Sequence, residues 1–138
     1  QKGEEKRQKL GTEIEKGVYV EGDEFWITSA VNNLISNAIK YTPKGGEIMI
    51  SVMQEGGFGI IKIKDTGPGF TDEDKKKIFG KFQKLSARPT GDEPSSGLGL
   101  SIVKEIIDKH NGEIVLNSKA GEGSEFIVKL HQQFRDEG

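Results

Sequence analysis

The chain has 138 residues, with 20 Lys and Arg against 22 Asp and Glu, 19 Gly, 4 Pro and no Cys. This length suffices for one domain with a buried core, and the lack of Cys excludes disulfides and Cys-based zinc sites. A formal net charge of −2 argues against binding nucleic acid through a positive field over the whole domain. The apolar runs are far shorter than the roughly 20 residues that cross a membrane. Because the chain begins with Gln1 and has no signal peptide, we expect it to be part of a longer protein.

The N-terminal third predicts a polar arm, a weak strand and one helix. Residues 1–11 are almost all polar and predict an arm or linker, and residues 12–20 alternate loosely as a weak strand. Asp23 can cap a helix, because apolar residues then recur with helical spacing over 27–39. Pro43 ends this helix, since proline disfavours the helical conformation of the residue before it.

The middle of the chain predicts a hairpin and a long loop. Residues 47–54 and 58–65 alternate on either side of a Gly-Gly turn, which predicts an antiparallel pair of strands. Residues 66–96 are rich in Gly, Pro and charge, with one short apolar cluster at 78–82, and predict a long loop that holds a single helical turn. Irregular stretches of this length in compact domains are usually binding loops, lids or disorder.

The C-terminal part predicts a helix over 96–110 and a second strand pair, 113–118 with 124–130, before a polar tail at 132–138. The order of the elements predicts an α+β fold: a two-layer sandwich with a mixed, mostly antiparallel sheet and about three helices on one face. We expect this domain to occupy residues 12–131.

The first predicted helix carries a polar stripe beside its apolar face. Asn33, Asn37, Lys40 and Tyr41 lie on one side at helical spacing. Amide oxygens at this spacing can ligate a hard cation such as Mg²⁺, and a lysine can meet a phosphate. The spacing alone favours an ordinary solvated face.

Asp65 shares a strand face with the apolar residues Ile61 and Ile63, so its carboxylate points toward the core. A buried carboxylate is costly unless something hydrogen-bonds it, and the glycines that follow let the backbone approach a ligand closely. The alternative is that Asp65 caps its own turn. His110 and His131 have no nucleophile or metal-ligand neighbour in the sequence, which favours structural or exposed roles.

Residues 95–101 open the second long helix with Gly97 and Gly99. Free backbone N–H groups and the helix dipole make such an opening a natural anion site. The spacing fits neither a Walker A loop nor a dinucleotide fingerprint, and the alternative is a glycine-rich turn.

Four segments, in order along the chain, resemble the N, G1, F and G2 boxes of bacterial sensor histidine kinases. They are the stretch from Asn33 to Thr42, the run Asp65-Thr66-Gly67-Pro68-Gly69, the run Phe79-Gly80-Lys81-Phe82, and the run Gly97-Leu98-Gly99-Leu100. The resemblance covers about residues 18–130. It implies the Bergerat, or GHKL, ATP-binding fold shared with gyrase B, Hsp90 and MutL, with an ATP lid over about residues 71–96.

The resemblance implies a role for each matching residue. Asn37 would bind Mg²⁺, and Asn33 would help hold the metal or its waters. Lys40 would face the phosphates, Tyr41 would help close the base pocket, and Asp65 would accept a hydrogen bond from the adenine amine. The other nucleotide-binding residues that it implies are Gly67 and Gly69 at the base, Phe79, Phe82, Lys84 and Arg88 in the lid, and Gly97, Leu98, Gly99 and Leu100 at the phosphates.

Two departures from the family pattern bear on activity. After Phe82 the chain runs Gln83-Lys84, where an aromatic residue and an arginine often follow, so the lid's charge contact is expected from Lys84 or Arg88. The phosphoacceptor, a histidine followed by an acidic residue, is missing, because Asn111 follows His110. We therefore expect the chain to bind Mg²⁺ and ATP without phosphorylating itself.

The resemblance also implies partners and a location. The partners would be the dimerisation and phosphoacceptor domain of the same kinase and a downstream response regulator, with no nucleic acid. The location would be the cytoplasm, alone or as part of a membrane-anchored sensor, and the isolated domain would be a monomer. Two alternatives stay open: a serine kinase of the anti-sigma-factor type, and a non-catalytic module that binds a partner in a nucleotide-dependent way.

Overall fold

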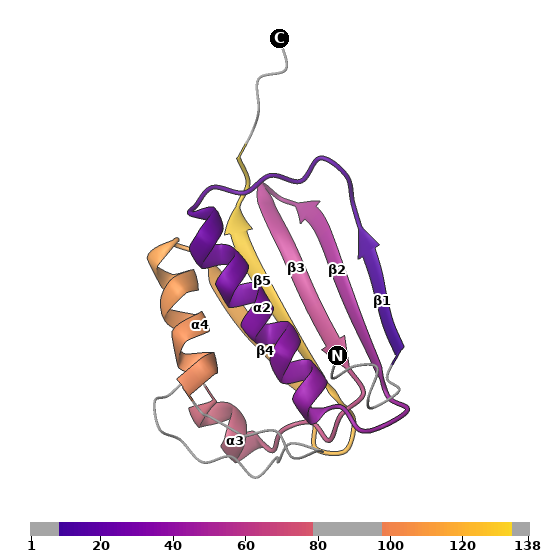
Figure 1. Ribbon diagram of the computed structural model, residues 1–138. Helices are drawn as coiled ribbons and strands as arrows, with labels where there is room; N and C mark the ends of the chain where they lie inside the picture. The colour runs from indigo at the N-terminus through magenta and orange to yellow at the C-terminus, as the bar shows by residue number, and fades with distance from the viewer. Residues whose placement is uncertain (1–8, 79–97, 134–138) are drawn as a thin grey trace.

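The computed structural model describes residues 9–78 and 98–133, which form a five-stranded sheet with helices packed on one face (Figure 1). The sheet order is β1-β2-β3-β5-β4, with β1 parallel to β2 and the other pairs antiparallel. The strands are β1 (Lys9–Ile14), β2 (Glu47–Glu55), β3 (Phe58–Asp65), β4 (Glu113–Ser118) and β5 (Ser124–His131). This arrangement confirms the predicted α+β two-layer sandwich.

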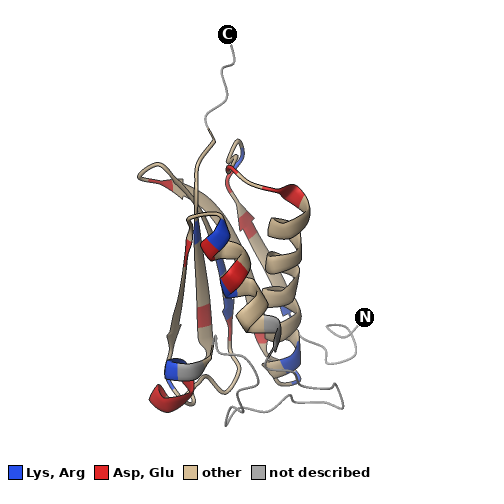
Figure 2. Ribbon diagram, turned by 90° about the vertical axis from the view of Figure 1, so that its left-hand side faces the viewer, with Lys and Arg blue, Asp and Glu red and all other residues tan. Residues whose placement is uncertain are grey.

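Two helices, α2 (Glu24–Tyr41) and α4 (Leu98–Lys109), lie side by side over the sheet, and the short α3 (Asp72–Lys77) lies at one end of the layers (Figure 1). The first turn of α3 is acidic, which is favourable against the helix dipole, and it is coloured red on the ribbon in Figure 2. Among the described residues, no helix combines the length and apolar character needed to span a membrane.

Helix α2 begins and ends where the sequence predicts. The Asp23 side chain accepts hydrogen bonds from the backbone N–H groups of Phe25 and Trp26, at 2.9 and 3.2 Å. The helix ends at Tyr41, two residues before Pro43. Its buried stripe is Ala30, Leu34 and Ala38, spaced four residues apart, and Leu34 is fully buried against the sheet and α4. The site described below lies at the C-terminal end of this helix.

His110 joins the two long helices at their other end. Its Nε2 accepts a hydrogen bond from the Asp23 backbone N–H at 3.0 Å, and its Nδ1 lies 2.8 Å from the Ile106 carbonyl oxygen, to which it donates. The ring therefore ties the end of α4 to the start of α2. This geometry confirms the structural role predicted for His110, while His131 lies exposed beside the Phe58 ring.

Two elements differ from the sequence prediction. The first strand was expected over residues 12–20, with 9–11 in the polar arm, but β1 covers 9–14 and pairs with β2, Lys9 opposite Glu47. The exposed fractions of Leu10 and Ile14 are 52% and 63%, so this edge strand buries little apolar surface and leaves almost no local pattern. Val20 forms only an isolated bridge.

The predicted loop holds its helical segment at α3, which covers residues 72–77 and is longer than the single turn expected. The Thr71 hydroxyl caps it by accepting from the Asp74 backbone N–H at 3.0 Å, and Ile78 follows as a buried core residue. Capping, rather than the apolar cluster, therefore sets this helix. The boundary expected between residues 131 and 132 lies at the end of β5, whereas most of the predicted lid falls outside the described residues.

Candidate functional site

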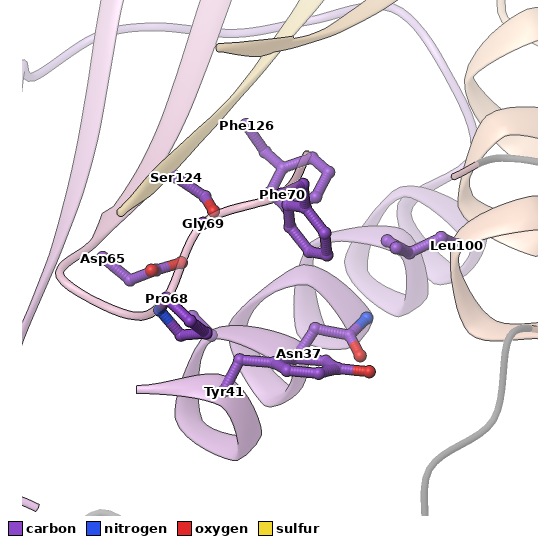
Figure 3. Close-up of a pocket in the computed structure, with 10 residues that line it drawn as sticks. Asn37, Tyr41, Asp65, Pro68, Gly69, Phe70, Leu100, Ser124 and Phe126 are labelled. Carbon is purple, nitrogen blue, oxygen red and sulfur yellow. The ribbon is translucent and has the colours of Figure 1, made fainter. Parts of the chain in front are cut away.

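A pocket lies between the two layers at the C-terminal end of α2 (Figure 3). Side chains from α2, β3 and the loop after it, α4 and β5 converge there. The lining residues are Asn37, Ala38, Tyr41, Asp65, Pro68, Gly69, Phe70, Leu100, Ser124 and Phe126. The cavity volume of about 10 Å³ has room for about one water molecule, so a larger ligand must displace a side chain.

Asp65 is the buried charge of this pocket. It is the last residue of β3, where strand alternation directs it to the helix-covered face, and only 6% of its surface is exposed. Burial raises the pKa of this carboxyl to about 6, while hydrogen bonds from the backbone N–H groups of Gly67 and Ser124 act in the opposite direction. The Gly67 bond is 2.8 Å long. The carboxyl therefore titrates close to neutral pH, and in its ionised form it can accept a further hydrogen bond from a ligand.

The loop after β3 requires its glycines. Gly69 has a φ of +72°, and an added Cβ would lie 2.1 Å from the Lys119 carbonyl oxygen. The neighbouring Pro68 carbonyl accepts a hydrogen bond from the Gly121 N–H at 2.6 Å. This loop is therefore pressed against the turn between β4 and β5, which holds its backbone close to the pocket.

Three aromatic rings make up the apolar side of the pocket. Phe70 is 5% exposed and makes edge contacts with Tyr41 and Phe126, with ring centroids 6.1 and 6.4 Å apart. Figure 3 shows the Phe70 ring between the carboxylate end of the pocket and Leu100 of α4. An aromatic or planar ligand group would find stacking partners here.

The structure brings together only some of the residues predicted for the site. Asn37, Tyr41, Asp65, Gly69 and Leu100 line the same pocket, although they come from three separate stretches of the chain. Gly67 is buried at its edge, where an added Cβ would lie 2.8 Å from the Tyr41 carbonyl oxygen. Of the other predicted residues, Asn33 and Lys40 are half-buried on α2 and do not line the pocket, and Leu98 and Gly99 begin α4. The predicted residues Phe79, Phe82, Lys84, Arg88 and Gly97 lie outside the described residues.

Sequence reasoning did not single out five lining residues: Ala38, Pro68, Phe70, Ser124 and Phe126. For Ser124 a signal was present. Strand alternation places Ser124 on the same face as Phe126 and Val128, which is the argument that located Asp65. A polar residue in line with core residues at a strand end was thus a second marker of this site.

A metal ion at this pocket would depend on amide oxygen. The described residues contain no group of three or more His, Cys, Asp and Glu side chains placed to hold a metal. Asn37 is half-buried and lines the pocket, and its amide oxygen is a hard donor that suits Mg²⁺. Because Mg²⁺ commonly completes its coordination with waters and substrate phosphates, one protein ligand is compatible with such a site.

Comparison with known proteins gives consistent similarities. Residues 22–133 match the family described as histidine kinase-, DNA gyrase B-, and HSP90-like ATPase. The sensor protein kinase PmrB of Pseudomonas aeruginosa is 38% identical over 130 residues, covering 90% of this chain and 27% of PmrB. The sensor-like histidine kinase SenX3 of Mycolicibacterium smegmatis is 39% identical over 124 residues, covering 88% of this chain and 32% of SenX3.

Solved structures give the same fold. The nucleotide-free catalytic domain of the histidine kinase ThkA superposes with a TM-score of 0.80 at 29% identity, covering 95% of this chain and 83% of that one. The chain spans about a quarter to a third of the length of the curated relatives above, 27% of PmrB and 32% of SenX3.

Proposed function

The chain belongs to the family of histidine kinase-, DNA gyrase B- and HSP90-like ATPases, and from this premise we propose that it is the ATP-binding catalytic domain of a sensor histidine kinase. In this function the domain holds ATP with Mg²⁺ and presents the γ-phosphoryl group to a histidine on a separate dimerisation domain. The similarity to PmrB and SenX3 favours this over the serine-kinase alternative.

The observation that carries the proposal is the buried Asp65 carboxylate in a pocket with an aromatic wall. A carboxylate in such a place costs free energy unless a ligand donates to it. The exocyclic amine of adenine is such a donor, and its planar ring suits the edges and faces of Tyr41 and Phe70. GTP presents a carbonyl oxygen at the matching position of its base. Asp65 therefore selects adenine over guanine.

The phosphate side of the site is proposed to combine α2 with the start of α4. Asn37 lines the pocket, and the start of α4 at Leu98 would offer backbone N–H groups to phosphate oxygens. Asn37 would hold Mg²⁺ through its amide oxygen, and the ion would supply positive charge that neutralises the phosphates. Asn33 and Lys40, on the same helix, are proposed to hold metal-bound waters and to face the phosphates.

Catalysis in this proposal is positioning and charge neutralisation. The histidine of the partner domain attacks the γ-phosphorus in line with the bond to the leaving ADP. Asn33 occupies the place where the hydrolysing relatives carry a glutamate, and its neutral amide cannot act as a general base for water. We therefore expect steady-state phosphate release by the isolated domain to be slow or undetectable.

The proposed partners and location follow from the same reading. The dimerisation and phosphoacceptor domain of the same kinase would receive the phosphoryl group, and a response regulator would take it next. The domain would act in the cytoplasm, alone or as part of a membrane-anchored sensor. The isolated domain would be a monomer, which sedimentation at micromolar concentration would check.

The test is calorimetric titration of ADP, ATP and GTP into the domain with Mg²⁺. We expect both adenine nucleotides to bind and GTP not to bind under the same conditions. A matched control is Asn117→Ala, which changes an exposed residue near the pocket and should leave ADP affinity unchanged. A folded wild-type domain that binds no adenine nucleotide, or binds GTP equally well, would contradict the proposal.

A further inference from the structure

A row of three polar side chains crosses the sheet at the pocket end. Asp65 of β3 is paired with Ser124 of β5, and Ser124 is paired with Ser118 of β4. Strand alternation turns all three toward the helix layer, in line with core residues such as Phe126. Asp65 and Ser124 line the pocket, whereas Ser118 lies one strand further away.

The Ser118 hydroxyl is used in two directions. It accepts a hydrogen bond from the Phe70 backbone N–H at 2.8 Å and donates to the Gly123 carbonyl oxygen at 2.8 Å. The Ser124 hydroxyl lies 3.2 Å away and can donate to the same Ser118 oxygen. One side chain therefore links the loop after β3 to the beginning of β5.

The backbone of Ser118 makes a further link. Its carbonyl oxygen accepts a hydrogen bond from the Nζ of Lys75, on α3, at 2.7 Å. Lys75 also lies 3.3 Å from the Asp72 carboxylate of its own helix. The residue thus contacts the loop that carries Phe70, the start of β5 and the helix that follows the loop.

The contact to Phe70 bears directly on the pocket. Phe70 is 5% exposed, and its ring lies between Tyr41 and Phe126 on the apolar side of the cavity. The free volume admits about one water, so groups that line the cavity, the Phe70 ring among them, must shift for a base to enter. The hydrogen bond from the Phe70 N–H to Ser118 holds the backbone of the loop in place, so that only the Phe70 side chain shifts.

We propose that Ser118 is a positioning residue for nucleotide binding, which acts by holding the Phe70 backbone so that the Phe70 ring forms one wall of the base pocket. The inference rests on the proposed function, because it concerns the same site. Ser118 does not touch the nucleotide in this proposal. Its effect passes through one hydrogen bond to the loop and one to Gly123.

The test compares Ser118→Ala with Ser118→Thr by titration with ADP and Mg²⁺. Removing the hydroxyl leaves a partly buried N–H without its partner, and we expect ADP affinity to fall about tenfold, equivalent to about 1.4 kcal/mol. The threonine variant keeps the hydroxyl on a strand that accepts β-branched residues, and should stay within about twofold of wild type. Hydrogen exchange of the Phe70 amide, followed by NMR, should accelerate in Ser118→Ala alone.

A matched control separates this role from a general loss of stability. Ile114→Val, on the same strand, removes a buried methylene far along the strand from the pocket, and should lower the melting temperature without changing ADP affinity. If Ser118→Ala binds ADP as wild type does, or Ile114→Val weakens binding equally, the positioning role is wrong and the proposed function stands. If the wild-type domain does not bind ADP, both proposals fail.

Discussion

Replacing Asp65 by Asn should stabilise the empty domain at neutral pH while it weakens nucleotide binding. The Asp65 carboxyl is 6% exposed, and burial raises its pKa from the usual 3.8 to about 6. A raised pKa means that the folded state favours the protonated form. Stability associated with this group is therefore fully present below pH 3.8 and is lost as the pH rises through about 6.

The difference between the two pKa values sets the magnitude. At about 1.36 kcal/mol for each pH unit, an ionised Asp65 costs the folded state roughly 3 kcal/mol above pH 7. The amide of Asn is neutral, and its oxygen can still accept from the Gly67 N–H, but its NH₂ group lacks an assigned acceptor. We expect a net gain of roughly 1–3 kcal/mol, or about 3–10 °C in melting temperature for a domain of this size.

The assay is calorimetric melting of both proteins without nucleotide between pH 4 and 8. The advantage of Asp65→Asn should be largest above pH 7 and should shrink steadily toward pH 4, because the folded wild-type carboxyl is then protonated and the unfolded one is close to its pKa of 3.8. ADP affinity should move the other way, falling by roughly 10- to 100-fold with the loss of a charge-assisted hydrogen bond. A variant that melts at or below the wild-type temperature at pH 7.5 would refute the burial argument.

Three further perturbations follow from the same geometry. ADP affinity measured by calorimetry should be constant above about pH 7 and should fall below about pH 6 as Asp65 is protonated. The phosphates of ADP also titrate, so Asp65→Asn is the reference for their effect, and the part of the fall that Asp65 causes should be missing from it. Gly69→Ala should lower the free energy of unfolding, measured by chemical denaturation, by roughly 2–5 kcal/mol, because the new Cβ would clash with a carbonyl oxygen. Gly121→Ala has a φ of +84° but open space around it, and should lower it by only about 1–2 kcal/mol. Equal costs would contradict the clash. His110→Ala should cost about 1–2 kcal/mol in the same assay through its lost bond to the start of α2, and an unchanged midpoint would count against that link.

Local patterns in the sequence sufficed for much of the scaffold. The four-residue spacing of Ala30, Leu34 and Ala38, with Asp23 before it and Pro43 after it, encodes α2 almost to the residue. The alternation around the Gly-Gly turn encodes the hairpin of β2 and β3. These elements form predictably because each buries a continuous apolar face whose period matches its own geometry.

The strand β1 and the helix α3 could not be located in this way. β1 is set by parallel pairing with β2, and the exposed Leu10 and Ile14 carry little of the burial that makes a pattern visible. α3 is set by the Thr71 cap and consists of charged residues, so no apolar spacing marks it, and the core residue Ile78 follows after the helix ends. In both cases a specific contact outweighs local hydrophobicity.

For the site itself, the sequence determined the chemistry and the tertiary structure decided the geometry. The alternation of side chains along β3 alone directs Asp65 toward the core, and the four motifs supply the resemblance to the family. Only the packed layers bring Asn37, Asp65 and Leu100 to one pocket, raise the Asp65 pKa through burial, and bring Ser118 within hydrogen-bond distance of Phe70. The reason is that desolvation and hydrogen bonds between distant segments depend on distances in space, which a local pattern of residues does not contain.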